Sequence, residues 1–557
     1  MLLRENGWKM AAPIAVLLCL WGGIYDLAAA VYGLVFACGL LCILKTKKKI
    51  CIPFNITTCG MAVIFLGTLV SVFPSADRGM ALIGVMRMAV PALFWILWCN
   101  LEETAREQMR MSLPCILAVL TGAAFVLYLV PAARPYLYRA DRLGGVFQYS
   151  NTYALLLLAV LLLLLCGREE WGKKDYLTAG ILICGIVFCG SRSVMVLAIV
   201  FAIVCIVCRK HERGSWNWRR ILPFSLLVIA ASVLMQMIFR LDVGRLGELT
   251  LSSSTLNGRF LYWQDAVPQI FTHPLGLGYM SYYYLQPQFQ TGKYVVRFVH
   301  NDILQMGLDA GILPMLALTV IFAAGIFGKK SPLSNRIALA VIGAHCLFDL
   351  DLQYISVFCI ALMCMRTESE REHILNGRGA LAGAGVLVIF YLYFATAMGL
   401  SQAGMNREAL ALYPGYTDGA LVLMEETDEA EIAEEIITEN GMAASAYECA
   451  AREHAARGEH EKTCEDVEGM LRCAGYDMYY YDQSVYYLSF ALNAAIEADD
   501  IDAGQKILEK IQEIPRILER LEERTSRLAW RINDKPEFEL EESVSTYLDS
   551  LSGVSLK

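Results

Sequence analysis

Long apolar runs fill most of the first 400 residues, and they restrict what this chain can fold into more than any other feature. A helix that crosses a bilayer needs roughly 20 consecutive, mostly apolar residues. Inside a bilayer the backbone must satisfy its own hydrogen bonds, so runs of this length predict spanning helices. We predict about thirteen spans, at residues 8–23, 24–44, 52–73, 79–99, 112–130, 151–166, 175–190, 193–208, 221–239, 301–327, 335–349, 352–365 and 380–400.

The remaining residues, 401–557, are polar and acidic. The whole chain is 56% hydrophobic with a net charge of −8, and much of the negative charge comes from this tail. A soluble domain is only about 45–50% apolar, so the apolar excess belongs to the first part. The contrast predicts an all-α protein with a transmembrane domain at 1–400 and a soluble helical domain at 401–557. Nothing in the charge balance indicates a nucleic-acid partner.

The positions of Lys and Arg predict how the helices are oriented. With a cytoplasmic N-terminus, every inner connection is basic, for example the one with Lys45, Lys47, Lys48 and Lys49. An odd number of spans then places 401–557 outside the membrane. The outer side still keeps nine arginines: Arg78, Arg134, Arg139, Arg142, Arg192, Arg240, Arg245, Arg259 and Arg297. Some of these can be interface anchors, but together they favour an anionic ligand on this side, because Arg binds phosphate with two parallel hydrogen bonds.

A long outer connection, residues 240–300, is also a candidate for a functional element, because long connections in compact domains are usually functional or disordered. It is rich in aromatic and amide side chains, which suit sugar rings and hydroxyls but also suit a membrane interface. His300 stands where the connection re-enters the membrane, with Arg297 just before it. Histidine is the usual general base near neutral pH. The alternative is an interfacial His that bonds to loop backbone.

Arg87 lies inside the fourth predicted span, in its outer half. An arginine at membrane depth is costly, so it normally faces a cavity or a charged partner. We therefore expect Arg87 either to line a substrate cavity or to form an internal ion pair.

Four short segments resemble the O-antigen ligase and polymerase family: Gly144–Asn151, Gly190–Ser193, Gly258–Trp263 and Val299–Gln305. They occur in the family's order, and the resemblance covers roughly residues 60–400. It implies a GT-C-type glycosyltransferase of the bacterial plasma membrane. Such an enzyme takes a glycan from a polyprenyl-diphosphate carrier on the outer face and transfers it to a lipid, glycan or protein acceptor. The chain departs from the family's pattern in one place. Asn301-Asp302-Ile303 follows His300 where the family often has an aromatic residue, so the identity of the acceptor stays open.

The resemblance also implies roles for individual residues. Arg192 and Arg259 would hold the diphosphate and His300 would serve the acceptor, while Arg87, Arg297, Tyr262 and Trp263 are expected at the substrate. Arginines that surround a departing diphosphate stabilise its charge, so we expect neither a metal nor another cofactor, and direct displacement would invert the anomeric centre. Asp349-Leu350-Asp351, close to His345, is formally a DxD sequence of the kind that binds metal elsewhere; for it we expect a structural or substrate-pocket role.

The tail, 401–557, is predicted to consist of successive helices that resemble tetratricopeptide repeats, without a strict 34-residue period. Such repeats usually present a surface to a protein or glycan partner, and the alternative is a helical cap on the outer loop. A long helix is expected over 501–527, with a kink or break at Pro515. Two other functions remain open for the whole chain: a transporter of polyprenyl-linked glycan, although no internal repeat is visible, and an envelope scaffold that acts through the tail.

Overall fold

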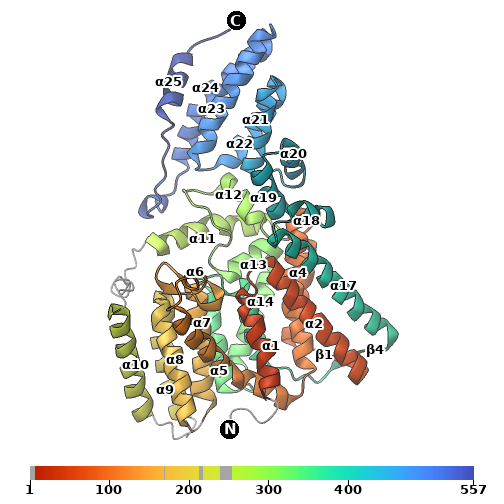
Figure 1. The fold of residues 1–557 in the computed structure, drawn as a ribbon, viewed down its shortest axis with the longest axis vertical. Helices are drawn as coiled ribbons and strands as arrows, with labels where there is room; N and C mark the ends of the chain where they lie inside the picture. The colour runs from red at the N-terminus through yellow and green to blue at the C-terminus, as the bar shows by residue number, and fades with distance from the viewer. Residues whose placement is uncertain (1–6, 169, 212–217, 239–253, 557) are drawn as a thin grey trace.

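The computed structural model describes residues 7–168, 170–211, 218–238 and 254–556, and most of these residues are helical. Figure 1 shows a broad helical bundle made by the first 400 residues and a narrower helical domain stacked on one end of it. The predicted all-α class is confirmed.

A helix lies at each of the thirteen predicted spans. The bundle contains α1 (Gly7–Cys19), α2 (Asp26–Lys47), α3 (Ile56–Val70), α4 (Arg78–Cys99), α5 (Glu103–Leu127), α7 (Ser150–Gly167), α8 (Lys173–Cys189), α9 (Arg192–His211), α10 (Trp218–Ile238), α13 (Asp302–Ala310), α14 (Ile312–Phe327), α15 (Leu333–Cys346), α16 (Ile355–Met363) and α17 (Gly377–Gln402). Short elements connect them: η1 (Trp21–Gly23), α6 (Arg134–Leu137), β2 (Tyr138–Arg139), β3 (Arg142–Leu143), η2 (Gly145–Phe147) and η4 (Asp351–Gln353).

Among the described residues, five helices are long and apolar enough to cross a bilayer: α2, α4, α5, α7 and α17. Four shorter apolar helices add to them, at Ile56–Val70, Arg192–Cys205, Ile221–Met237 and Ile312–Phe327. The expected span at 352–365 is wrong as a full crossing, because α16 has only 9 residues. A helix rises about 1.5 Å per residue, so nine residues cover less than half of a hydrocarbon core about 30 Å thick.

Helix α7 lies at the centre of the bundle. All its side chains from Leu155 to Leu164 are buried, as expected of a helix that is apolar on every side. It packs against α5, α8, α9 and α15. The N-terminal residues of α7 are therefore held at a fixed position among these helices.

The expected single span at 301–327 is divided into α13 and α14, and Gly311 is the reason. Gly311 has φ +98°, a backbone conformation that residues with a Cβ rarely adopt. A Cβ at this position would also lie 2.4 Å from the carbonyl oxygen of Pro274. The turn after Thr272 thus packs directly on the joint between the two helices.

The predicted outer connection, 240–300, is not one loop. Its first part, including Arg240 and Arg245, lies outside the described residues. The rest forms α11 (Ser254–Thr272), α12 (Ser281–Phe289) and the turns around them. In Figure 1 these two helices lie between the bundle and the C-terminal domain.

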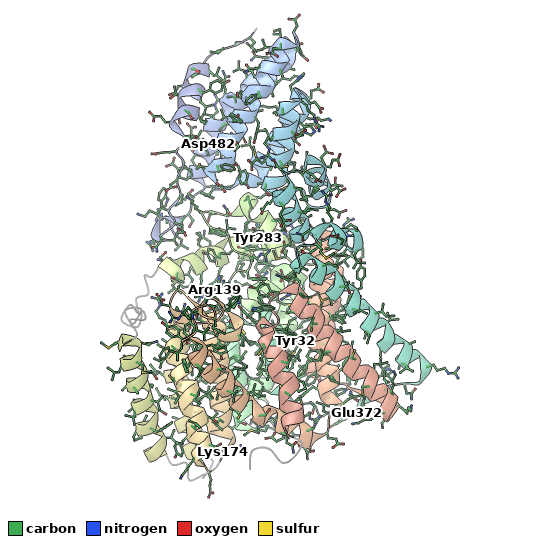
Figure 2. The ribbon with its side chains drawn as sticks, in the orientation of Figure 1. Tyr32, Arg139, Lys174, Tyr283, Glu372 and Asp482 are labelled. Carbon is green, nitrogen blue, oxygen red and sulfur yellow. The ribbon has the colours of Figure 1, made fainter. Side chains whose placement is uncertain are left out.

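Two strands that the sequence did not predict pair at the opposite end of the bundle. Strand β1 (Lys49–Pro53) runs antiparallel to β4 (Glu372–Asn376), with Lys49 opposite Asn376. Figure 2 shows Glu372 and Lys174 at this end, away from Asp482 of the C-terminal domain. Connections predicted to be cytoplasmic thus lie at the end of the bundle opposite the C-terminal domain.

The C-terminal domain is a succession of antiparallel helices. They are α18 (Asn406–Leu412), α19 (Thr417–Thr427), α20 (Ala430–Glu439), α21 (Ala444–Ala456), α22 (His460–Ala474), α23 (Met478–Glu497), α24 (Ile501–Glu523), η5 (Ala529–Arg531) and α25 (Glu542–Leu551). Of the expected kink or break at Pro515, the break is wrong, because α24 continues through this residue, with Ile507, Ile511, Ile514 and Leu518 buried along one face. The likeness to tetratricopeptide repeats stays a prediction.

A buried carboxylate joins the two domains. Asp77, which caps α4, accepts hydrogen bonds from Thr417 Oγ1 (2.6 Å) and Asn440 Nδ2 (3.0 Å) of the C-terminal domain. Beside it, Tyr413 Oη donates to the carbonyl of Gly79 at 2.7 Å. These buried polar contacts hold the C-terminal domain against the N-terminal end of α4.

Candidate functional site

The candidate site is built around the carboxylate of Asp349, in the turn between α15 and η4. The side chain is completely buried. Five hydrogen bonds reach it: Oδ1 accepts from Tyr149 Oη (2.7 Å), His300 Nδ1 (3.1 Å) and the Leu350 backbone N–H (3.0 Å), and Oδ2 accepts from Asn151 Nδ2 (2.9 Å) and Arg259 Nη2 (2.9 Å). A carboxylate has about four lone-pair sites, so these donors use its whole capacity.

Arg259 and His300 come to this carboxylate from separate elements of the outer connection. Arg259 lies on α11, whereas His300 precedes α13 by two residues. Trp263, one turn after Arg259, donates its indole N–H to the carbonyl of Val299 at 2.9 Å. This bond fixes α11 beside the backbone of His300. The ring of Tyr262 lies 6.3 Å from the imidazole, centroid to centroid.

The hydrogen bond to Asp349 sets the tautomer of His300. A carboxylate can only accept, so Nδ1 of His300 carries the hydrogen. In a neutral imidazole the other nitrogen, Nε2, is then an acceptor that can take a proton. The side chain is 23% exposed, so solvent or a substrate can reach it. Asn301 caps α13 by accepting from the backbone N–H groups of Ile303 and Leu304, and His300 directly before it has a positive φ of 51°.

Burial by itself raises the pKa of Asp349, but the hydrogen bond from His300 and the charge of Arg259 outweigh it. The result is a pKa below the usual range of an aspartate. Asp349 is thus ionised at neutral pH and pairs with Arg259, whose side chain is 11% exposed. A guanidinium has five N–H donors, and the bond to Asp349 engages only part of this capacity.

Arg192 is linked to the turn that carries Asp349 through the next residue in the chain, Ser193. It is the first residue of α9, after Gly190 at φ +58° ends α8. Ser193 bonds to His345 Nε2 at 2.9 Å, and His345 Nδ1 bonds to Asp351 Oδ2 at 2.6 Å. Asp351 is two residues from Asp349, so the segment with Arg192 is tied to the same turn.

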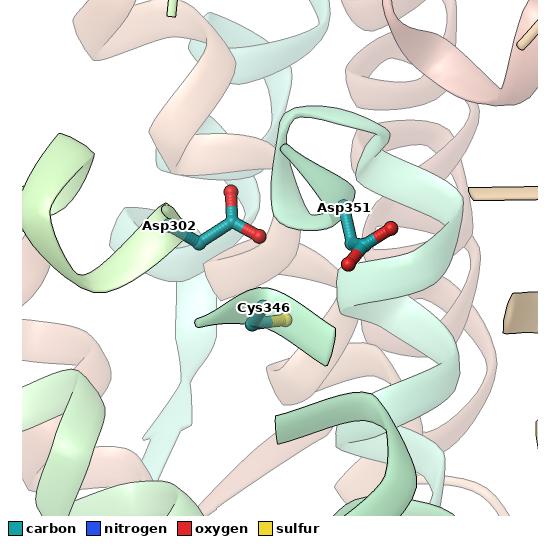
Figure 3. Close-up of side chains that lie close together, drawn as sticks. All are labelled: Asp302, Cys346 and Asp351. Carbon is teal, nitrogen blue, oxygen red and sulfur yellow. The ribbon is translucent and has the colours of Figure 1, made fainter. Parts of the chain in front are cut away.

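Asp302 and Cys346 lie beside Asp351, as Figure 3 shows. One ligand atom from each of the three residues lies within 4.8 Å of the others, and all three side chains are buried. Both oxygens of Asp351 already accept hydrogen bonds, from His345 and from Thr152 Oγ1 at 2.7 Å. Metal independence stays a prediction, which the filled hydrogen-bonding capacity of Asp349 favours.

The structure does not bring the other two predicted arginines to Asp349. Arg87 forms an ion pair with Asp26 at 2.8 Å and donates to the carbonyl of Gln353 at 3.0 Å, in η4. Of the two alternatives for Arg87, the internal ion pair is present. Arg297 pairs with Asp418 of the C-terminal domain at 2.5 Å, and its guanidinium lies 5.8 Å from the ring centroid of Tyr283.

Tyr149 and Asn151 were not predicted as site residues, and for Asp349 a structural or substrate-pocket role was expected. A signal was present, because Tyr149 and Asn151 belong to the first motif and Asp349 to the DxD sequence. Nothing in the sequence shows, however, that residues about 200 positions apart bond to each other. In the structure, Asp349 of the DxD sequence accepts hydrogen bonds from α7, from α11 and from the segment before α13.

Comparison with known proteins gives one match, to the family model described as O-antigen ligase, at residues 177–319. The matched range runs from α8 into α14 and contains Arg192, Arg259, Arg297 and His300, whereas Arg87 and Asp349 lie outside it. Neither the curated proteins nor the solved structures give a match. The match supports the resemblance noted in the sequence: residues 177–319, with Arg192, Arg259 and His300, are similar to O-antigen ligases.

Proposed function

We propose that the protein is a membrane glycosyltransferase of the O-antigen ligase type. It transfers a glycan from a polyprenyl-diphosphate carrier to an acceptor hydroxyl during the synthesis of a cell-surface polysaccharide. The observation that carries the proposal is that Arg259 and His300 meet on the carboxylate of Asp349. A cation and a base at one carboxylate suit a reaction that releases an anion and takes a proton.

The roles follow from the chemistry of this transfer. The leaving group is a diphosphate, and negative charge grows on its bridging oxygen as the bond to the sugar breaks. Arg259 stabilises this charge by hydrogen bonds that are already oriented by Asp349. Arg192, at the N-terminus of α9, adds a second cation where the helix dipole also favours an anion.

His300 removes the proton of the acceptor hydroxyl through Nε2. Asp349 accepts the Nδ1–H, which keeps this tautomer and stabilises the imidazolium that forms. The hydroxyl oxygen attacks the anomeric carbon as the diphosphate leaves, so a single displacement inverts the anomeric centre. No metal is needed, because arginines supply the positive charge.

The location of the site supports transfer at the outer face of a bacterial plasma membrane. Asp349 bonds to Arg259 of α11, and α11 and α12 lie between the bundle and the C-terminal domain (Figure 1). The basic connections lie at the other end, which is cytoplasmic by the distribution of Lys and Arg. With this orientation the C-terminal domain is extracytoplasmic. An arginine–histidine site at one end of the bundle favours an enzyme of one leaflet over a transporter or a scaffold.

The test is a transfer assay with polyprenyl-diphosphate-linked glycan and membranes that contain His300→Ala. We expect turnover to fall about 10²–10⁴-fold, the usual contribution of a general base. The matched control is His273→Ala: His273 is an exposed histidine of the same outer connection, and its imidazole bonds to Thr272 Oγ1 and to the carbonyl of Gln269, both nearby in the chain. Its activity should equal that of the wild type. Near-normal turnover of a well-expressed His300→Ala variant would exclude His300 as the base.

A further inference from the structure

The turn that carries Asp349 has a second carboxylate, Asp351, with a separate set of partners. Asp349 binds the two groups that the proposed reaction uses directly, Arg259 and His300. Asp351 binds His345 and Thr152 instead. Both carboxylates are fully buried. A buried charge needs such partners, since each unpaired one costs several kcal/mol.

From Asp351, hydrogen bonds continue to the segment before α9. The carboxylate accepts the Nδ1–H of His345 at 2.6 Å, which leaves Nε2 as an acceptor when the ring is neutral. Ser193 Oγ lies 2.9 Å from Nε2, and Ser191 Oγ lies 3.2 Å from Ser193 Oγ. Arg192 stands between these two serines at the start of α9.

We propose that His345 and Asp351 are positioning residues that hold Ser193, and through it Arg192, in place for the donor diphosphate. The inference rests on the proposed function and adds to it the residues that position Arg192. One turn, Asp349-Leu350-Asp351, then positions both groups of site residues. Asp349 positions Arg259 and His300, and Asp351 positions Arg192 through His345 and Ser193.

The order Ser193–His345–Asp351 also has the geometry of a nucleophile, a base and an orienting carboxylate. Burial argues against a nucleophilic role here. The side chain of His345 is 0% exposed, so the imidazole cannot meet a leaving group and return a proton to it. Buried His345 instead connects Ser193 to Asp351 by one hydrogen bond on each side of its ring.

The experiment compares Ser193→Ala with Ser193→Thr in the transfer assay, at varied concentrations of donor. Alanine removes the hydroxyl, and threonine keeps it. We expect Ser193→Ala to lower kcat/KM for the donor about tenfold, which corresponds to about 1.4 kcal/mol, mainly through a higher KM. Ser193→Thr should recover most of the loss. The matched control is Ser112→Ala, a buried serine of α5 whose hydroxyl donates to the carbonyl of Met109 in the same helix.

A double mutant tests the link to Arg192. In an Arg192→Ala background, Ser193→Ala should add little, because the group that it positions is already gone. A full additional tenfold loss in that background would overturn the proposal. Wild-type kinetics of Ser193→Ala, or a Ser193→Thr variant no better than alanine, would also overturn it.

A binding measurement separates this inference from the proposed function. Polyprenyl diphosphate without glycan should raise the melting temperature of the purified wild-type protein, and raise that of Ser193→Ala less. If the wild type binds this lipid but transfers no glycan, the proposed function fails and the inference stands on the binding result. If both proteins show the same shift, the inference fails, whatever the transfer assay shows.

Discussion

Replacing Asp349 by asparagine tests the central carboxylate of the site while keeping its shape. In the variant an N–H₂ group takes the place of one carboxylate oxygen. If it replaces Oδ2, it meets two donors, Asn151 Nδ2 and Arg259 Nη2, each now 2.9 Å away. If the amide turns over, the N–H₂ meets Tyr149 and His300 instead. Either orientation leaves buried donors without an acceptor.

The size of the effect follows from these contacts. Removing one partner of a buried ion pair costs about 3–5 kcal/mol, because the remaining charge stays buried without compensation. Arg259 is 11% exposed, so relaxation toward water reduces this cost, and we expect a loss of about 2–4 kcal/mol in the free energy of unfolding. We expect turnover to fall at least about 100-fold, since the variant also loses the acceptor that orients Nδ1–H of His300.

The assay is glycan transfer from the polyprenyl-diphosphate donor, with thermal unfolding in detergent as the measure of stability. The matched control is Asp428→Asn. Asp428 is a solvent-exposed carboxylate of the C-terminal domain that pairs with Arg452, and its backbone is left-handed, which asparagine tolerates. A folded Asp349→Asn protein with activity within about threefold of the wild type would refute the reasoning, since an effect below 1 kcal/mol is too small for this role.

Three further predictions concern metal, pH and the joint between α13 and α14. Treatment with EDTA should leave transfer unchanged, because five donors already occupy Asp349; loss of activity that Mg²⁺ or Mn²⁺ restores would contradict this. The pKa of Asp349 is lowered in the folded state, so its contribution to stability is present above the unfolded pKa near 4 and is lost as the pH falls. The difference in melting temperature between wild type and Asp349→Asn should therefore be constant above about pH 5 and narrow on further acidification; a difference that widens would be evidence against the pairing. Gly311→Ala should lower the free energy of unfolding by at least about 1–3 kcal/mol, because alanine meets both the positive φ and the Pro274 carbonyl; an unchanged melting temperature would show that the turn can move away.

Much of the fold could be predicted from the sequence, because spanning helices depend on local composition. A run of apolar residues has to be helical in a bilayer wherever its neighbours lie. The expected spans 8–23 and 24–44, and likewise 175–190 and 193–208, are separate helices in the structure, and the glycines at their joints, Gly22, Gly23 and Gly190, have positive φ. The break at Gly311 was not predicted, because its cause is a contact with Pro274, on a turn far away in the sequence. Pro515 shows the opposite case, where packing of an apolar helix face keeps a helix continuous despite a local breaker.

For the candidate site, the sequence by itself determined the kinds of residue and the side of the bundle: Arg192, Arg259 and His300 in motifs near the predicted outer ends of helices. Only the tertiary structure decided which of these residues contact each other. It placed Asp349 under Arg259 and His300, linked Asp351 through His345 to Ser193, and directed Arg87 and Arg297 to other carboxylates. The physical reason is the distance along the chain over which each interaction acts. Hydropathy and helix breaks act over a few neighbouring residues, whereas a buried charge must find its partner wherever the packed helices bring one within hydrogen-bonding distance.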